Sequence, residues 1–128
     1  MSGLLNRVLN YLADTDQVIE QGKSGSWYYR KWKSGRRECW GAFGYPNTAM
    51  TTQEGSGYYA AQKTINFPSN FFSDRLTAIA SAELDGALGG FSVRSADKTS
   101  MTGYFWATRS TTKNCWLNIY AIDRSDIT

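Results

Sequence analysis

Acidic side chains are the groups in this chain that most readily suggest chemistry, because two carboxyl groups held ~5–10 Å apart can cleave a glycosidic bond. The candidates for such a pair are Glu20, Glu38, Glu54, Glu83 and Asp85. Spacing along the chain does not by itself establish that any two of them lie at that separation. Histidine is absent, which removes the commonest general base and metal ligand. We therefore predict no catalytic residues and no enzymatic activity.

The two cysteines, Cys39 and Cys115, are each followed by a tryptophan inside a strand-like run. This setting predicts buried, unreactive thiols. Two sulfurs without histidine cannot complete the four ligands of a zinc site, so we expect no metal and no cofactor. A disulfide between the two cysteines is the alternative, and it would need their strands to be adjacent.

The 128 residues suffice for one domain with a two-sheet core. Aromatic residues make up 15% of the chain, with five Trp and eight Tyr, which exceeds what a small core needs and favours a surface that a partner covers. No apolar stretch approaches the ~20 residues of a membrane span. We expect no membrane insertion.

Basic and aromatic residues alternate between Arg30 and Arg37, as they do in proteins that bind single-stranded nucleic acids. The net charge is only +3, and a carboxylate, Glu38, is expected opposite Lys31. A phosphate-binding groove would not gain from that carboxylate. We therefore expect no nucleic-acid partner.

Residues 27–41 predict a β-hairpin in which two aromatic strands flank Ser34-Gly35 as a two-residue loop. The pairs expected from this loop are Lys33 with Arg36, Lys31 with Glu38, Tyr29 with Trp40 and Trp27 with Ala42. One face then carries Trp27, Tyr29, Lys31, Glu38 and Trp40. Because the opposite face is also aromatic, we expect one face to cover the core and the other to meet a partner.

The same segment, W-x-Y-R-K-W-x-S-G-x-x-E-C-W-G, resembles a motif in the C-terminal domains of phage and prophage tail-fibre and minor structural proteins. The resemblance extends from Val18 to Arg124, with Phe67-Pro68 and Phe71-Phe72 as weaker landmarks. It implies a place in a virion, and it implies no chemistry. Synthesis in the host cytoplasm is expected separately, because the sequence shows no membrane span and no apolar signal-peptide core.

A short helix is predicted over residues 2–13, ahead of the β-domain. Leu5, Val8, Leu12, Thr15 and Ile19 recur at alternating steps of three and four, which is the pattern of a coiled-coil seam. A helix this short is marginal unless its stripe is buried, either on its own domain or around an axis. We assign residues 1–16 to oligomerisation, through Leu5, Val8 and Leu12, and residues 17–128 to the β-domain.

The rest of the chain predicts an antiparallel β-sandwich, jelly-roll-like, with a strand beginning at Val18 and a long loop over residues 44–57. Turns are expected at Asp85-Gly86 and Gly89-Gly90. The remaining strands are expected over residues 58–67, 75–83, 91–95, 101–108 and 115–122.

These features favour a homotrimeric virion protein that associates with other virion proteins, such as a tail-fibre or head-fibre tip that binds host-surface polysaccharide. Flat aromatic rings cover the apolar face of a sugar while polar groups bind its hydroxyls. The residues expected to do this are Tyr45, Asn47, Tyr58 and Tyr59, beside the polar loop. A purely architectural virion protein, a carbohydrate-binding module outside a virion and a glycoside-cleaving tail enzyme are the alternatives.

Overall fold

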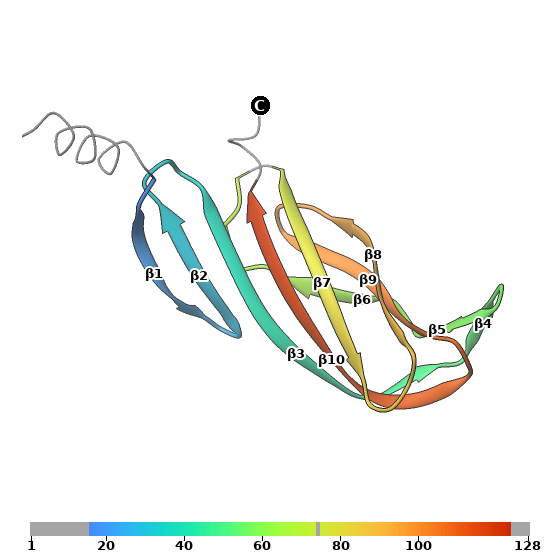
Figure 1. Ribbon diagram of the computed structural model, residues 1–128. Helices are drawn as coiled ribbons and strands as arrows, with labels where there is room; N and C mark the ends of the chain where they lie inside the picture. Colours follow the sequence, from blue (N-terminus) through green and yellow to red (C-terminus); the bar gives the residue numbers. More distant parts are fainter. Residues whose placement is uncertain (1–15, 74, 124–128) are drawn as a thin grey trace, which may run out of the picture.

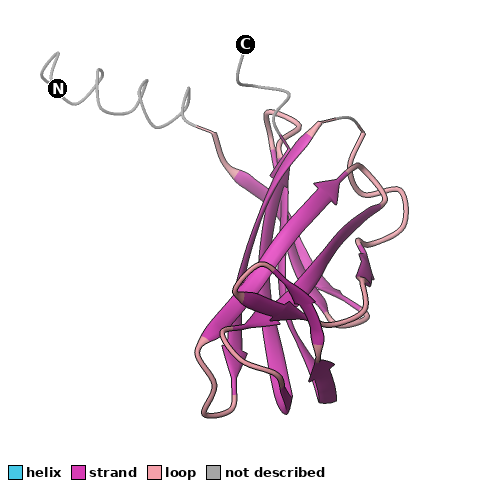
Figure 2. Ribbon diagram, turned by 90° about the vertical axis from the view of Figure 1, so that its right-hand side faces the viewer, coloured by secondary structure: helices cyan, strands magenta, loops and turns pink. Residues whose placement is uncertain are grey.

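The computed structural model describes residues 16–73 and 75–123, and within them every regular element is a β-strand (Figures 1 and 2). None of the described residues belongs to a helix long and apolar enough to cross a membrane. The strands are β1 (Val18–Ser24), β2 (Trp27–Trp32), β3 (Arg37–Met50), β4 (Thr52–Glu54), β5 (Gly57–Tyr59), β6 (Lys63–Asn66), β7 (Leu76–Leu84), β8 (Gly89–Ala96), β9 (Ser100–Ala107) and β10 (Thr111–Asp123).

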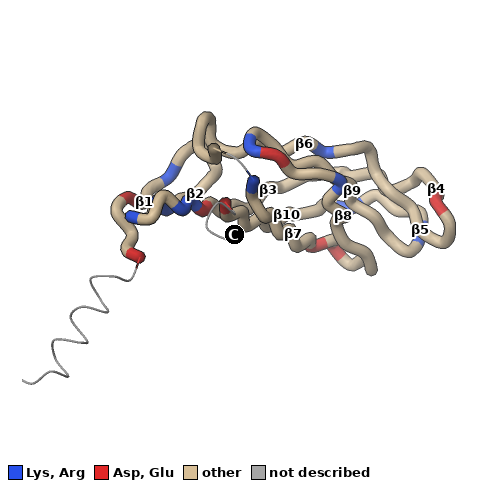
Figure 3. Tube along the Cα trace, turned by 90° about the horizontal axis from the view of Figure 1, so that it is seen from above, with Lys and Arg blue, Asp and Glu red and all other residues tan. Residues whose placement is uncertain are grey.

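The strands form two antiparallel sheets that face each other (Figures 1 and 3). Sheet A has the order β1-β2-β3-β10-β7. In sheet B, the central strand β9 pairs with β8 on one side and with β5 and β6 in succession on the other, and β4 pairs with β5. The two facing antiparallel sheets agree with the predicted sandwich. In the described part of the chain each sheet has five strands, and β1, β2 and β3 are neighbours in one sheet. A jelly roll has two four-stranded sheets, so the jelly-roll-like part of the prediction is wrong.

The core lies between the two sheets, and strict alternation along the strands supplies its side chains. In β10, Cys115, Leu117 and Ile119 are buried while the residues between them are exposed. Sheet B contributes Phe105, whose ring meets Tyr45 of sheet A edge-on at a centroid distance of 5.4 Å. Aromatic contacts of this kind add ~0.5–1.5 kcal/mol to the burial itself.

The hairpin of β2 and β3 forms as predicted, but the predicted register differs from the observed one by one residue. Tyr28 pairs with Trp40 and Arg30 pairs with Glu38. The loop has three residues, since the Gly35 N–H donates to the Trp32 carbonyl and Gly35 has a φ of +96°. A type I turn followed by a left-handed glycine makes this longer loop.

The new register changes which side chains share a face. Trp27, Tyr29 and Cys39 lie on the core side, whereas Tyr28 and Trp40 lie on the outer side. The predicted Lys31–Glu38 pair is absent, because Lys31 pairs with Glu20 at 3.4 Å. Glu38 is buried on the outer side of sheet A.

The predicted loop over residues 44–57 is also wrong, because β3 continues to Met50 alongside β10. Pro46 and Asn47 lie in a bulge, where they face the single residue Asn114. The Asn47 N–H donates to Asn114 Oδ1 at 3.0 Å, and Asn47 has a φ of 51°. A bulge is a position at which a strand tolerates proline.

Other expectations fare better. The first strand begins at Val18, and the segments predicted around β7, β8, β9 and β10 are strands. The predicted turn at Asp85-Gly86 is present. Gly89-Gly90 opens β8 and is not a turn. The predicted helix, with Leu5, Val8 and Leu12, lies outside the described residues.

Both cysteines are free and buried, as predicted. Cys39 pairs with Ala121 and Cys115 pairs with Tyr45, so the two thiols lie far apart along neighbouring strands. Burial, with a smaller contribution from Glu38, raises the pKa of the Cys39 thiol to about 12. A thiol with so high a pKa is a poor nucleophile at neutral pH.

Candidate functional site

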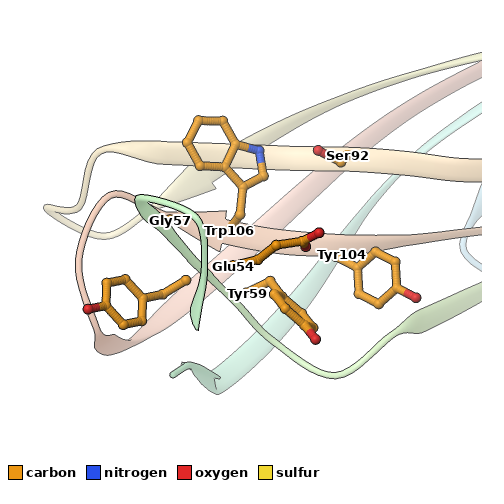
Figure 4. Close-up of a pocket in the computed structure, with 7 residues that line it drawn as sticks. Glu54, Gly57, Tyr59, Ser92, Tyr104 and Trp106 are labelled. Atoms are coloured by element: carbon orange, nitrogen blue, oxygen red, sulfur yellow. The ribbon is translucent and has the colours of Figure 1, made fainter. Parts of the chain in front are cut away.

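A hollow of about 390 Å³ on the outer face of sheet B gathers aromatic and polar side chains (Figure 4). Register places its residues side by side, because Tyr59 pairs with Trp106 and Tyr104 pairs with Ser92. The alternation of β9 directs Tyr104 and Trp106 outward and Phe105 into the core. The lining residues are Glu54, Gly57, Tyr58, Tyr59, Ser92, Tyr104 and Trp106.

Trp106 forms the flat part of the hollow. Its cross-strand neighbour is Gly90, and a Cβ placed on Gly90 would lie 3.4–3.5 Å from three atoms of the indole. Near-equal distances to three ring atoms mean that the indole lies face-down over the glycine. The side chain is 38% exposed. One face of the ring is thus held against the sheet, while the other is accessible.

Tyr104 and Tyr59 form a second aromatic contact beside Trp106. Their rings meet edge-on with a centroid distance of 5.6 Å and an interplanar angle of 79°. The Tyr104 hydroxyl donates to Gln62 Oε1 at 3.1 Å, and Arg94 Nη1 donates to the same oxygen at 3.0 Å. These bonds fix Tyr104 from the side, so the ring is pre-organised before any ligand arrives.

The polar groups of the hollow are suited to binding hydroxyl groups. Ser92 and the phenol of Tyr59 can donate and accept, and the Glu54 carboxylate accepts. Glu54 is the one carboxylate among the lining residues. Glycoside cleavage of the usual kind uses a pair of carboxyl groups, and these lining residues supply one. No cluster of potential metal ligands occurs among the described residues.

The structure brings together two of the four predicted ligand residues. Tyr58 and Tyr59 line the hollow, whereas Tyr45 packs against the core with its ring beneath Lys63 Nζ at 5.3 Å. Burial raises the pKa of the Tyr45 phenol. Asn47 holds the β3 bulge through its backbone.

Trp106 and Tyr104 were not among the predicted site residues. Their spacing of two within a strand was visible in the sequence, since it places both rings on one face. Which face met solvent, and that Tyr59 would lie beside them, depended on the pairing of β5 with β9.

Solved structures resemble the whole described fold. An N-truncated R1-type pyocin tail fibre matches with a TM-score of 0.62 and 14% sequence identity, over 97% of this chain and 98% of its own. A C-terminal R1 pyocin fibre fragment from P. aeruginosa matches with a TM-score of 0.63 and 14% sequence identity, over 97% of this chain and 32% of its own. An N-truncated R2-type pyocin tail fibre matches with a TM-score of 0.51 and 15% sequence identity, over 96% of this chain and 43% of its own.

The chain thus spans about a third of the longer R1 fragment and less than half of the R2 fragment. At these identities the likeness shows a shared fold. No protein-family model matches the sequence, and no curated protein sequence matches it.

Proposed function

We propose that this chain is a structural module of a bacteriophage tail fibre, or of a related tail-like particle, that binds host-surface glycan through the outer face of sheet B. The fold shared with pyocin tail fibres supports the first part. The observation that carries the second part is the accessible indole of Trp106, with Tyr59 and Tyr104 beside it.

The geometry suits a sugar ring. A pyranose would lay its C–H face on the exposed side of the indole, while its hydroxyls reach Ser92 and the Glu54 carboxylate. One shallow site of this kind binds weakly, so useful attachment requires several copies. We therefore propose that the chain acts as a homotrimer within a virion, in contact with other virion proteins.

Sedimentation with purified cell walls from a panel of Gram-positive and Gram-negative bacteria tests the proposal. We expect wild-type protein to sediment with walls of its host, and Trp106→Ala to lose most of this binding. Val93→Ala is the control, because Val93 is an apolar residue of sheet B that is 39% exposed and does not line the hollow. Light scattering of each variant checks that the number of copies is unchanged.

Titration with oligosaccharides prepared from the same walls measures the single site, independently of valency. Loss of about tenfold or more in affinity for Trp106→Ala alone supports the site. Equal binding by wild type and Trp106→Ala would place the glycan elsewhere. Absence of binding to every wall would leave the architectural role, and released oligosaccharide would identify an enzyme.

A further inference from the structure

The outer face of sheet A carries a second aromatic surface, with one large side chain from each of four neighbouring strands. Cross-strand register aligns them, since Tyr28 pairs with Trp40, Trp40 with Tyr120 and Tyr120 with Ile79. We call these four residues the sheet A row. Ile79 is 62% exposed and Tyr28 is 49% exposed. So large an apolar stripe on a monomer surface marks an interaction site.

The sheet A row differs from the hollow on sheet B because two of its rings, Tyr28 and Trp40, already have an aromatic and a cationic neighbour each. Tyr28 and Trp40 stack on each other with an interplanar angle of 19° and a centroid distance of 6.3 Å. The Arg30 guanidinium lies 5.0 Å from the centre of the Trp40 ring, and Lys23 Nζ lies 5.5 Å from that of Tyr28. These contacts compete with a sugar for the faces of the two rings, whereas the exposed face of Trp106 has no cation over it among the described residues.

A shallow trough runs beside the row, where the next residues along the strands are small. Ala42 pairs with Asn118, and Asn118 pairs with Ser81. Together with the row they enclose about 420 Å³. A ridge next to a trough is a shape that a protein surface can interlock with.

The two edges of sheet A carry opposite charges on this face. Lys23 lies on β1 and is exposed, while Glu83 near the end of β7 and Asp85 just after it are also exposed. Strands β1 and β7 are opposite edges of the sheet. Among the described residues, neither Lys23 nor Glu83 has an ion-pair partner. The face is therefore complementary to a second copy of itself.

We propose that the outer face of sheet A is the surface through which copies of this chain associate, with the β1 side of one copy against the β7 side of the next. Such a head-to-tail contact is heterologous, and it closes into a ring when the rotation allows. The proposal rests on the self-association in the proposed function and names where it occurs. It also leaves the hollow on sheet B facing away from the axis, accessible to glycan.

Light scattering of Ile79→Lys tests the apolar part. Ile79 is exposed, so the substitution leaves the monomer folded but places an unpaired charge in the contact. We expect at least a tenfold rise in the dissociation constant. Thr64→Lys is the matched control, since Thr64 is a β-branched, exposed strand residue on sheet B. Circular dichroism confirms the fold of both variants.

Charge exchange tests the orientation without changing the apolar row. Lys23→Glu and Glu83→Lys should each weaken association by about threefold to tenfold, and the double variant should restore it. The wild-type contact should weaken as salt is added.

A multimeric wild type that Ile79→Lys leaves intact would overturn this interface and leave the proposed function untouched. Single charge variants whose defects simply add in the double variant would overturn the head-to-tail arrangement. A wild type that is monomeric at micromolar concentration would overturn the self-association itself, while the glycan-binding assay would still stand on its own.

Discussion

Replacement of Glu38 by glutamine should destabilise this protein more than any comparable change of an exposed carboxylate. The Glu38 side chain is 8% exposed and accepts a hydrogen bond from Trp32 Nε1 at 3.2 Å. The other oxygen, Oε2, accepts a hydrogen bond from the Tyr120 hydroxyl, and Arg30 Nη1 lies 3.6 Å from Oε1, the oxygen bonded to Trp32. Glu38→Gln keeps the shape and removes the charge.

The magnitude follows from these contacts. A hydrogen bond to a charged group contributes ~1.5–3 kcal/mol against ~0.5–1.5 for a neutral pair, so the two hydrogen bonds together lose ~1–3 kcal/mol. The ion pair adds only ~0–1 kcal/mol, because the Arg30 side chain is 44% exposed. We therefore expect the free energy of unfolding to fall by ~1–4 kcal/mol, and Tm by roughly 4–16 °C.

Urea unfolding followed by circular dichroism measures the loss, provided that the m-value is unchanged. Glu20→Gln is the matched control. Glu20 also binds a tyrosine hydroxyl and a basic side chain, with Tyr29 at 3.0 Å and Lys31 at 3.4 Å, but it is 51% exposed. We expect little change for it. A Glu38→Gln variant within ~0.5 kcal/mol of wild type, or one no less stable than Glu20→Gln, would refute the reasoning.

Three further results are expected. Cys39 and Cys115 should resist alkylation in the native protein and react fully in denaturant without reductant; a need for reductant would establish a disulfide. Hydrogen bonds from Thr99 hold the pKa of Asp97 below its usual value, so its contribution to stability is present above pH ~4 and is lost as the pH falls. In Asp97→Asn, the unfolding midpoint should fall less steeply than in wild type as the pH is lowered from 5 to 2. An equally steep fall would contradict this. Burial and the hydrogen bond to Glu38 raise the pKa of Tyr120 to about 12, so its contribution is complete below pH ~10 and is lost as the pH rises. Absorbance at 295 nm should show a late ionisation step, after that of the more exposed tyrosines, which Tyr120→Phe lacks. A late step that Tyr120→Phe retains in full would contradict the assignment to Tyr120.

Local pattern determined where many of the strands lie. In β10, buried Leu117 and Ile119 alternate with exposed residues, and this period of two is a property of the backbone that the sequence displays directly. Residues 75–83, most of which belong to β7, were predicted to be a strand from the neighbouring strands and from the motif resemblance. The thiols of Cys39 and Cys115 were likewise predictable, since each occurs within a strand that must bury one face.

The tertiary structure decided register and pairing. Ser34-Gly35 fits both a two-residue and a three-residue loop, and the difference of one residue moved Trp40 to the outer face. Residues around Pro46 have weak strand propensity, yet β10 supplies hydrogen-bonding partners that keep them in β3.

The candidate site follows the same rule. Tyr59 and Trp106 are far apart in the sequence and meet because β5 pairs with β9, while Gly90 lies under the indole because β8 pairs with the other side. The residues of each strand fix which side chains share a face. Which strands pair, and so which side chains from different strands become neighbours, is decided by the tertiary structure. The reason is that the free energy of each pairing depends on how the whole core packs.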